Sequence, residues 1–304
     1  MSSIVKAMGK LNVTPDKQED SVQGSAPDLH NNAQTSPQER QAEVKEFHSP
    51  PVLEISNSRL KELGMISAGG DQRERRVKDE FRAIKHKLIK NAYGAGSEYI
   101  QNSNMVMVSS SNANEGKTYI AINLALSIAS EKDKTVLLVD ADVLNPSVGH
   151  TLDLEHRPGL IDYLLGDVDS LADIIYPTSI PDLRIMPAGT SHHLSYELLS
   201  SDRMLALTKE LATRYPDRMI VLDCPPLLGV VETVTLSNLI GQAVVVVEQN
   251  KTKVSDVKQA VSLLNSDMAV GFVINKAVHN TGHGYGYGYG YGYGYGYGST
   301  GKGK

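Results

Sequence analysis

The feature that most constrains this 304-residue chain is a regular alternation of short apolar runs with longer amphipathic stretches. Six runs are nearly continuous and rich in β-branched residues, which is typical of buried strands in a parallel sheet. They are MVMV (105–108), TVLLVD (135–140), LRIMPAG (183–189), RMIVLD (218–223), AVVVVE (243–248) and VGFVIN (270–275). Helical patterns separate them at 117–130, 159–166, 195–214, 232–240 and 253–265. The sequence therefore predicts an α/β fold, a mostly parallel sheet with helices on both faces.

The composition divides the chain into three parts. Residues 1–50 are expected to form a short N-terminal helix and a disordered linker, because 12–50 are rich in Gln, Ser, Pro, Asp and Glu and contain little that could be buried. Residues 51–278 carry the strand and helix pattern of one domain. Residues 279–304 form a tail that is rich in glycine and tyrosine.

Charge, apolar runs and cysteine content exclude several classes of protein. The net charge of −5 argues against a broadly basic surface for nucleic acid. No run approaches the roughly 18 apolar residues that would span a bilayer, so direct membrane insertion is not expected. The single cysteine, Cys224, excludes a disulfide within one chain and suits a reducing compartment. These features predict a cytoplasmic protein.

A candidate phosphate-binding loop follows the first predicted strand. SSSNANEGKT (109–118) matches G-x-x-x-x-G-K-[ST] at Gly116, Lys117 and Thr118, with Ser111 in place of the first glycine. Backbone N–H groups of such a loop bind polyphosphate, while the lysine neutralises phosphate charge and the hydroxyl ligates Mg²⁺. Asn114 tolerates a positive φ better than most residues. The predicted nucleotide-binding residues are Ser111, Asn112, Ala113, Asn114, Glu115, Gly116, Lys117, Thr118, Tyr119 and Asn275.

Three aspartates follow two other predicted strands. Asp140 and Asp142 end VLLVDAD, and their side chains share a face if the backbone stays extended there. Asp223 ends MIVLD, directly before a pair of prolines. An acid at the end of an apolar strand commonly holds Mg²⁺ in proteins with a phosphate loop. One metal does not need all three acids, so one of them is a candidate general base.

The sequence resembles the bacterial tyrosine autokinases, or BY-kinases, of exopolysaccharide biosynthesis. More narrowly, it resembles the autokinase of exopolysaccharide loci associated with exosortase. The resemblance rests on four motifs in order: the loop Ser111–Thr118, a second motif Val136–Asp142, a Walker B motif Ile220–Pro226, and a tyrosine cluster Tyr285–Tyr297. It implies a P-loop NTPase fold of the septum-placement (MinD-like) type, and ATP and Mg²⁺ as cofactors.

The resemblance also implies roles for particular residues. Lys117, Asp140 and Asp142 are expected to be catalytic, and Thr118, Asp142 and Asp223 to hold Mg²⁺. Which of Asp140 and Asp142 acts as base stays open. DEFRAIK (79–85) resembles the assembly motif of the family, with Asp79, Arg82 and Lys85 in register, and implies a ring-shaped homo-oligomer; the alternative is a solvated helix face.

The chain also departs from the family in two places. Leu144 stands where the second motif usually has an arginine, so any role of that arginine is absent. Asn112 stands where the partition and septum-placement ATPases carry a signature lysine. The resemblance further implies a separate activator, a membrane protein that determines chain length and recruits the kinase to the inner membrane.

The tail supplies candidate phosphate acceptors. Seven of the fourteen tyrosines alternate with glycine: Tyr285, Tyr287, Tyr289, Tyr291, Tyr293, Tyr295 and Tyr297. Alternating glycine disfavours a helix and a packed core, so the phenols are expected to reach solvent. Full phosphorylation adds roughly −10 to −14 charges, at about −1.5 to −2 per site.

These observations predict an ATP-dependent tyrosine autokinase that phosphorylates its own tail in trans and regulates exopolysaccharide synthesis. Two other functions remain open. One is a regulatory ATPase switch that leaves the tail unmarked, and the other is a non-catalytic scaffold that assembles through Gly-Tyr contacts. Asn275 and Lys276, after the last predicted strand, are candidate adenine contacts, and an ordinary turn at a strand end is the alternative.

Overall fold

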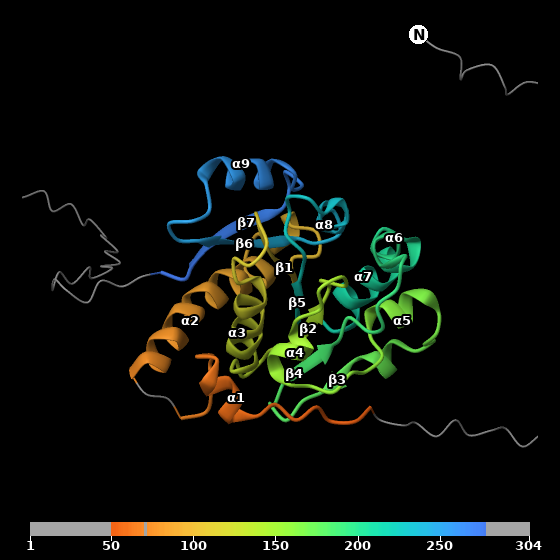
Figure 1. Ribbon diagram of the computed structural model, residues 1–304, viewed down its shortest axis with the longest axis horizontal. Helices are drawn as coiled ribbons and strands as arrows, with labels where there is room; N and C mark the ends of the chain where they lie inside the picture. The colour runs from red at the N-terminus through yellow and green to blue at the C-terminus, as the bar shows by residue number, and fades with distance from the viewer. Residues whose placement is uncertain (1–49, 70–71, 278–304) are drawn as a thin grey trace, which may run out of the picture. The chain divides into compact units, whose positions relative to one another are not determined.

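The computed structural model describes residues 50–69 and 72–277, and these contain one seven-stranded sheet (Figure 1). The strand order is β3-β4-β2-β5-β1-β6-β7. All neighbours pair in parallel except β3, which is antiparallel to β4. The strands are β1 (Met105–Ser110), β2 (Thr135–Asp140), β3 (Tyr176–Pro177), β4 (Leu183–Met186), β5 (Arg218–Asp223), β6 (Gln242–Glu248) and β7 (Ala269–Asn275). The predicted fold class and the six predicted strands are confirmed, but the burial predicted for 270–275 is wrong: β7 is an edge strand, and its Phe272 and Ile274 are exposed.

Helices lie on both faces of the sheet. They are α1 (Asn57–Glu62), α2 (Gln72–Tyr93), α3 (Lys117–Ala129), α4 (Val148–Leu152), α5 (Leu160–Leu165), α6 (Ser195–Leu199), α7 (Asp202–Arg214), α8 (Val231–Ser237) and α9 (Val254–Ser262), with 3-10 turns η1 (Ser97–Tyr99) and η2 (Leu171–Ile174). The single helix predicted over 195–214 is wrong. It is divided before Asp202, because Ser201 accepts a hydrogen bond from the Met204 N–H at 3.2 Å and caps the start of α7.

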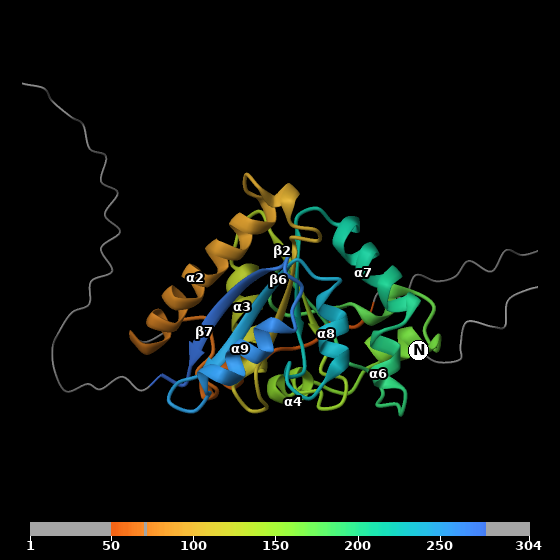
Figure 2. The same ribbon diagram turned by 90° about the horizontal axis from the view of Figure 1, so that it is seen from above.

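Two buried clusters follow from the strand period of two. Even-numbered residues of β1 and β2, such as Val106 and Leu138, pack under α1 to α4. Odd-numbered residues, such as Met107 and Leu137, pack under α5 to α9. Figure 2 shows α2 and α3 on one side of the sheet and α6 and α7 on the other. Because β1, β2, β5 and most of β6 are buried on both faces, their sequences read as continuous apolar runs.

Two predicted segments lie outside the described residues. These are the N-terminal helix and linker within 1–49 and the tyrosine tail from 278 onward. Among the described residues, no helix combines the length and the apolar character needed to cross a membrane.

Candidate active site

The phosphate loop, residues 109–118, joins the carboxyl end of β1 to the start of α3. Two of its residues adopt left-handed backbone conformations, Asn114 with φ 65° and Gly116 with φ 96°. The positive φ expected of Asn114 is confirmed. A Cβ added at Gly116 would lie 2.0 Å from Asn275 Nδ2, so a larger residue would displace that side chain as well as strain the backbone. Left-handed residues of this kind are typical of turns whose backbone N–H groups bind an anion.

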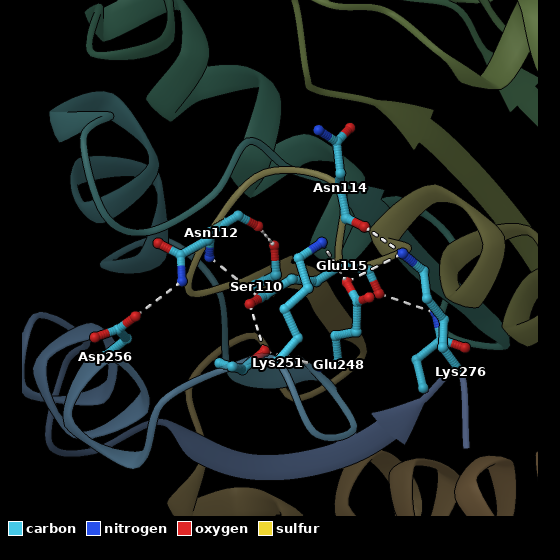
Figure 3. A network of polar contacts seen from close by, with 10 residues as sticks. Ser110, Asn112, Asn114, Glu115, Glu248, Lys251, Asp256 and Lys276 are labelled. Carbon is cyan, nitrogen blue, oxygen red and sulfur yellow. Dashed lines mark hydrogen bonds and ion pairs between the residues drawn. The ribbon is translucent and has the colours of Figure 1, made fainter. Parts of the chain in front are cut away.

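Glu115 is buried inside the loop, with 2% of its surface exposed, and its carboxylate holds the loop in place. Its Oε2 accepts a hydrogen bond from the Asn112 N–H at 3.1 Å, and its Oε1 accepts one from Thr252 Oγ1 at 2.6 Å. Asn112 Nδ2 donates to Asp256 Oδ2 of α9 at 3.2 Å (Figure 3). The connection from β6 to α9 thus holds the loop through side chains. Thr252 and Asp256 were not predicted, because nothing local in the sequence marks them.

The end of β7 fixes the loop from the other side. Asn275 Nδ2 donates to the Glu115 carbonyl oxygen at 2.9 Å. Lys276 Nζ donates to the Asn114 carbonyl oxygen at 2.7 Å and to Glu248 Oε2 at 3.1 Å (Figure 3). The structure therefore assigns Asn275 a contact with the phosphate loop, and its adenine contact stays a prediction.

Lys117 and Asp142 meet at the mouth of the loop. Lys117 opens α3 and is 9% exposed, and its Nζ lies 3.6 Å from Asp142 Oδ2. Asp142 Oδ1 accepts a hydrogen bond from the Asn145 N–H at 3.4 Å. Burial raises the pKa of Asp142, and the Lys117 ammonium opposes that rise. This pair holds the lysine at the place where phosphate charge would be neutralised.

Thr118 joins the loop to the acid at the end of β5. Its hydroxyl donates to Asp223 Oδ2 at 2.6 Å and lies 2.6 Å from Ser147 Oγ. A hydroxyl beside a strand-end carboxylate is the arrangement that holds Mg²⁺ in phosphate-loop proteins. Ser147 was not predicted, and the only local signal is its position shortly after the Asp142 motif.

Asp140 and Asp223 lie opposite each other on the paired strands β2 and β5, and both are almost fully buried. Asp140 Oδ2 accepts a hydrogen bond from the Val148 N–H at 3.0 Å. Burial, and then the nearby Asp223, raises the pKa of Asp140 well above its ordinary value. Burial also raises the pKa of Asp223 to about 7, against the lowering effect of the Thr118 hydrogen bond.

The unpartnered oxygens in this region fit a metal ion and an anion. Among the described residues, Oδ1 of both Asp140 and Asp223 and the Oγ of Ser111 are buried without a hydrogen-bond partner. Buried carboxylate oxygens are costly unless a donor or a cation meets them. No three His, Cys, Asp or Glu side chains of the described residues form a complete metal site. Mg²⁺ usually completes its shell with water and substrate phosphates, so the donor set still fits.

Two cavities flank the segment 145–149. The first, of about 740 Å³, is lined by Lys117, Thr118 and Asp142 together with Asn145 and Ser147 of that segment. A volume of this size fits a nucleotide. The second, of about 300 Å³, is lined by thirteen residues: Leu53, Asp140, Pro146, Gly149, His150, Leu154, Glu155, His156, Arg157, Ile185, Pro187, Ala188 and Gly189. Asp140 is the last residue of β2 and Asp142 lies two residues beyond it, and the two acids line different cavities.

Other predicted residues lie away from the nucleotide cavity. The Tyr119 hydroxyl donates to the Gly64 carbonyl oxygen at 2.8 Å, and its ring packs edge-on against Phe81. Asp79 and Arg82 are exposed on α2. Lys85 is instead buried, with its Nζ 2.7 Å from Glu131 Oε2. Lys85 is therefore engaged within its own chain.

A phosphate loop between a strand and a helix, with acids at the ends of neighbouring parallel strands, defines a P-loop nucleotide-binding protein. The comparisons with known proteins narrow this class. Residues 103–266, more than half of the chain, match the family model described as AAA domain. The tyrosine-protein kinase YwqD of Bacillus subtilis is 32% identical over 173 residues, which are 56% of this chain and 71% of the relative. The chain belongs to the AAA domain family and to the bacterial tyrosine-protein kinases.

Two further relatives show how far the similarity extends. The succinoglycan biosynthesis transport protein ExoP of Rhizobium meliloti is 32% identical over 192 residues, 61% of this chain and 23% of that protein. The crystal structure of the VpsO kinase domain has a TM-score of 0.54 and 27% identity, and the match covers 67% of this chain and 97% of that domain. The chain thus spans about a quarter of the length of several relatives, which are larger proteins.

Proposed function

We propose that this protein is an ATP-dependent tyrosine autokinase that transfers the γ-phosphoryl group of ATP to its own tail, residues Tyr285–Tyr297. The observation that carries this proposal is the convergence of Lys117, Thr118, Asp142 and Asp223 at the phosphate loop, beside a cavity of about 740 Å³. The tyrosine-kinase relatives support it.

Mg²⁺ is the cation that the site would hold, through the Thr118 hydroxyl and the carboxylates of Asp142 and Asp223. When bound, it neutralises charge on the β- and γ-phosphates. Lys117 Nζ stabilises the charge of the transferring group, and the loop N–H groups hold the phosphates in place. Asn275 and Lys276 keep those N–H groups oriented by holding the carbonyl oxygens of Glu115 and Asn114.

The transfer step forms one bond and breaks one. The phenol oxygen attacks the γ-phosphorus, the bond from that phosphorus to the β,γ-bridging oxygen breaks, and ADP leaves. The phenol proton passes to Asp140, whose Oδ1 has no partner among the described residues. In this proposal the tyrosine approaches through the second cavity, which both Asp140 and His150 line.

Assembly and location follow as further parts of the proposal. Transfer takes place in trans within a homo-oligomeric ring, in which the exposed Asp79 and Arg82 of α2 contact the neighbouring subunit. Lys85 holds α2 in place beneath this surface through its ion pair with Glu131 of the same chain. The kinase works in the cytoplasm and is recruited to the inner membrane by a separate membrane protein that determines chain length. It regulates the synthesis and export of an exopolysaccharide.

The test is to incubate the purified chain with Mg·ATP and to locate phosphate by mass spectrometry. We expect phosphate on Tyr285–Tyr297, none in Lys117→Met, and wild-type levels in Lys132→Met, a matched change at an exposed lysine. ADP release without tail phosphate would support the regulatory ATPase instead. Neither product would support the scaffold.

Trans transfer has its own test. A Lys117→Met chain is mixed with an active chain that lacks residues 279–304. Phosphate on the tail of the inactive chain is expected, and its absence contradicts transfer between subunits. Arg82→Ala is expected to lower the molar mass measured by light scattering, whereas an unchanged mass contradicts the α2 interface.

A further inference from the structure

A small arginine-lined pocket lies at the amino end of the sheet, opposite the phosphate loop. Arg218 opens β5 and Arg184 is on β4, the two strands on either side of β2. Their register partners on β2 are Thr135 and Leu137, two residues apart, so both arginines lie on the sheet face that α7 covers. The pocket has a volume of about 210 Å³.

Arg218 is the anchor of this pocket. It is only 7% exposed, and its guanidinium lies 3.8 Å from the centre of the Tyr215 ring, in a cation–π contact. Its Nε is buried and has no hydrogen-bond partner among the described residues, and neither Arg218 nor Arg184 forms an ion pair with any of them. A buried guanidinium without an ion-pair partner is unfavourable, so the site favours an anion.

The charges around Arg218 also favour the binding of an anion. Arg214 also lines the pocket, although its guanidinium is paired with Glu210 at 2.6 Å. Burial lowers the pKa of Arg218, and the positive charges of Arg184 and Arg214 lower it further, while Asp217 opposes them. An anion between the arginines would relieve this repulsion.

The rest of the pocket is apolar. Leu171, Ala172 and Ile175 around η2, and Leu211 of α7, form its walls. Its volume is below the roughly 300–1,000 Å³ of pockets for drug-sized ligands, so it takes one side chain and not a nucleotide. Two forked guanidinium groups suit a phosphate, and apolar walls suit an aromatic ring.

We propose that this pocket binds phosphotyrosine, with the phosphate between Arg184 and Arg218 and the ring against the apolar walls. The supply of phosphotyrosine from Tyr285–Tyr297 rests on the proposed function, whereas the affinity of the pocket does not. Binding would give the modified tail a docking site far from the nucleotide, on the same chain or on a second copy. Binding of the tail to this pocket would therefore depend on whether the tail has been phosphorylated at the nucleotide site, which lies at the opposite end of the sheet.

The test measures binding of a labelled peptide, Gly-Tyr-Gly-phosphotyrosine-Gly-Tyr-Gly, by fluorescence anisotropy. The protein is the full chain with Lys117→Met, which keeps its own tail unmodified. Arg184→Gln, at an exposed position, is expected to weaken binding at least about ten-fold, the loss typical of a charge-assisted hydrogen bond. Lys209→Gln removes the same charge from an exposed position of α7 outside the pocket and is expected to leave binding unchanged.

Three results would overturn the assignment. They are equal binding of the unphosphorylated peptide, an equal loss with Lys209→Gln, and displacement by inorganic phosphate as effective as by phosphotyrosine. A phosphoserine peptide is expected to bind more weakly, since it leaves the apolar walls uncovered. Because the peptide is synthetic, it binds whether or not the chain is a kinase, so failure of the proposed function is seen separately in the Mg·ATP experiment.

The source of the phosphotyrosine is decided with tail-phosphorylated protein. Association that increases with concentration and is lost in Arg184→Gln identifies the tail of a second copy. If the tail is protected from a phosphatase equally at every protein concentration, and this protection is lost in Arg184→Gln, the pocket binds the tail of its own chain. Tail phosphate that is equally accessible in wild type and Arg184→Gln contradicts docking from either source.

Discussion

Asparagine in place of Asp223 is expected to change how the stability of the chain depends on pH. Asp223 is fully buried at the end of β5, and burial raises its pKa from 3.8 to about 7. Asparagine has nearly the same shape and keeps an oxygen that can accept the Thr118 hydrogen bond. It removes the charge that must be buried above pH 7, and with it the repulsion that helps to raise the pKa of Asp140.

Proton linkage gives the direction and the size of the change in the free energy of unfolding with pH. Below pH 3.8 the carboxyl is protonated in both the folded and the unfolded chain. Between pH 3.8 and about 7 the folded chain keeps the proton and the unfolded chain has lost it, so the free energy of unfolding falls as pH rises. At 1.36 kcal/mol per pH unit, the two units from pH 5 to pH 7 cost the wild-type chain about 3 kcal/mol. Above pH 7 the contribution is constant.

Urea unfolding at pH 5, 6, 7 and 8, with EDTA and without nucleotide, measures this effect. The wild-type chain should lose about 3 kcal/mol relative to Asp223→Asn between pH 5 and pH 8. A pH-independent cost of the substitution does not matter, because it is the same at every pH. Parallel profiles for wild type and Asp223→Asn would refute the reasoning, and so would an equal effect of Asp133→Asn at an exposed position.

Saturating Mg·ADP provides a second arm of the same experiment. A cation beside Asp223 favours the ionised carboxylate, so the wild-type decline with pH should flatten and its stability should rise. Asp223→Asn should gain much less. An equal gain in both chains would mean that Asp223 does not hold the metal.

Three substitutions test the phosphate loop and its surroundings. Gly116→Ala should lower ATP affinity at least about ten-fold in calorimetry, because an added Cβ would lie 2.0 Å from Asn275 Nδ2 at a φ of 96°; Gly271→Ala, where the nearest atom is 3.9 Å away, is the control. Asn275→Ala should weaken ATP binding about two- to ten-fold through loss of the hydrogen bond to Glu115, and unchanged affinity would contradict the role given to β7. Leu144→Arg should speed tail phosphorylation about ten-fold without loss of stability, since Leu144 is 42% exposed; an unchanged rate would show that the family's arginine has no counterpart role here.

The sequence by itself determined the sheet and the loop. Runs such as Val136–Asp140 are apolar on both alternating faces, so they predict strands that are covered on both sides, and the structure confirms them. The phosphate loop was found because its residue types follow from local backbone needs, such as the positive φ of Asn114 and Gly116. Local sequence carries this information because strand period and turn conformation depend on near neighbours.

Only the tertiary structure decided which residues that are distant in the sequence come into contact. Thr252 and Asp256 reach the phosphate loop, and Arg184 and Arg218 line one pocket, because the strand order brings distant segments together. It also placed Asp140 and Asp142 in the walls of two different cavities. Contacts of this kind depend on topology and register, which no local pattern encodes.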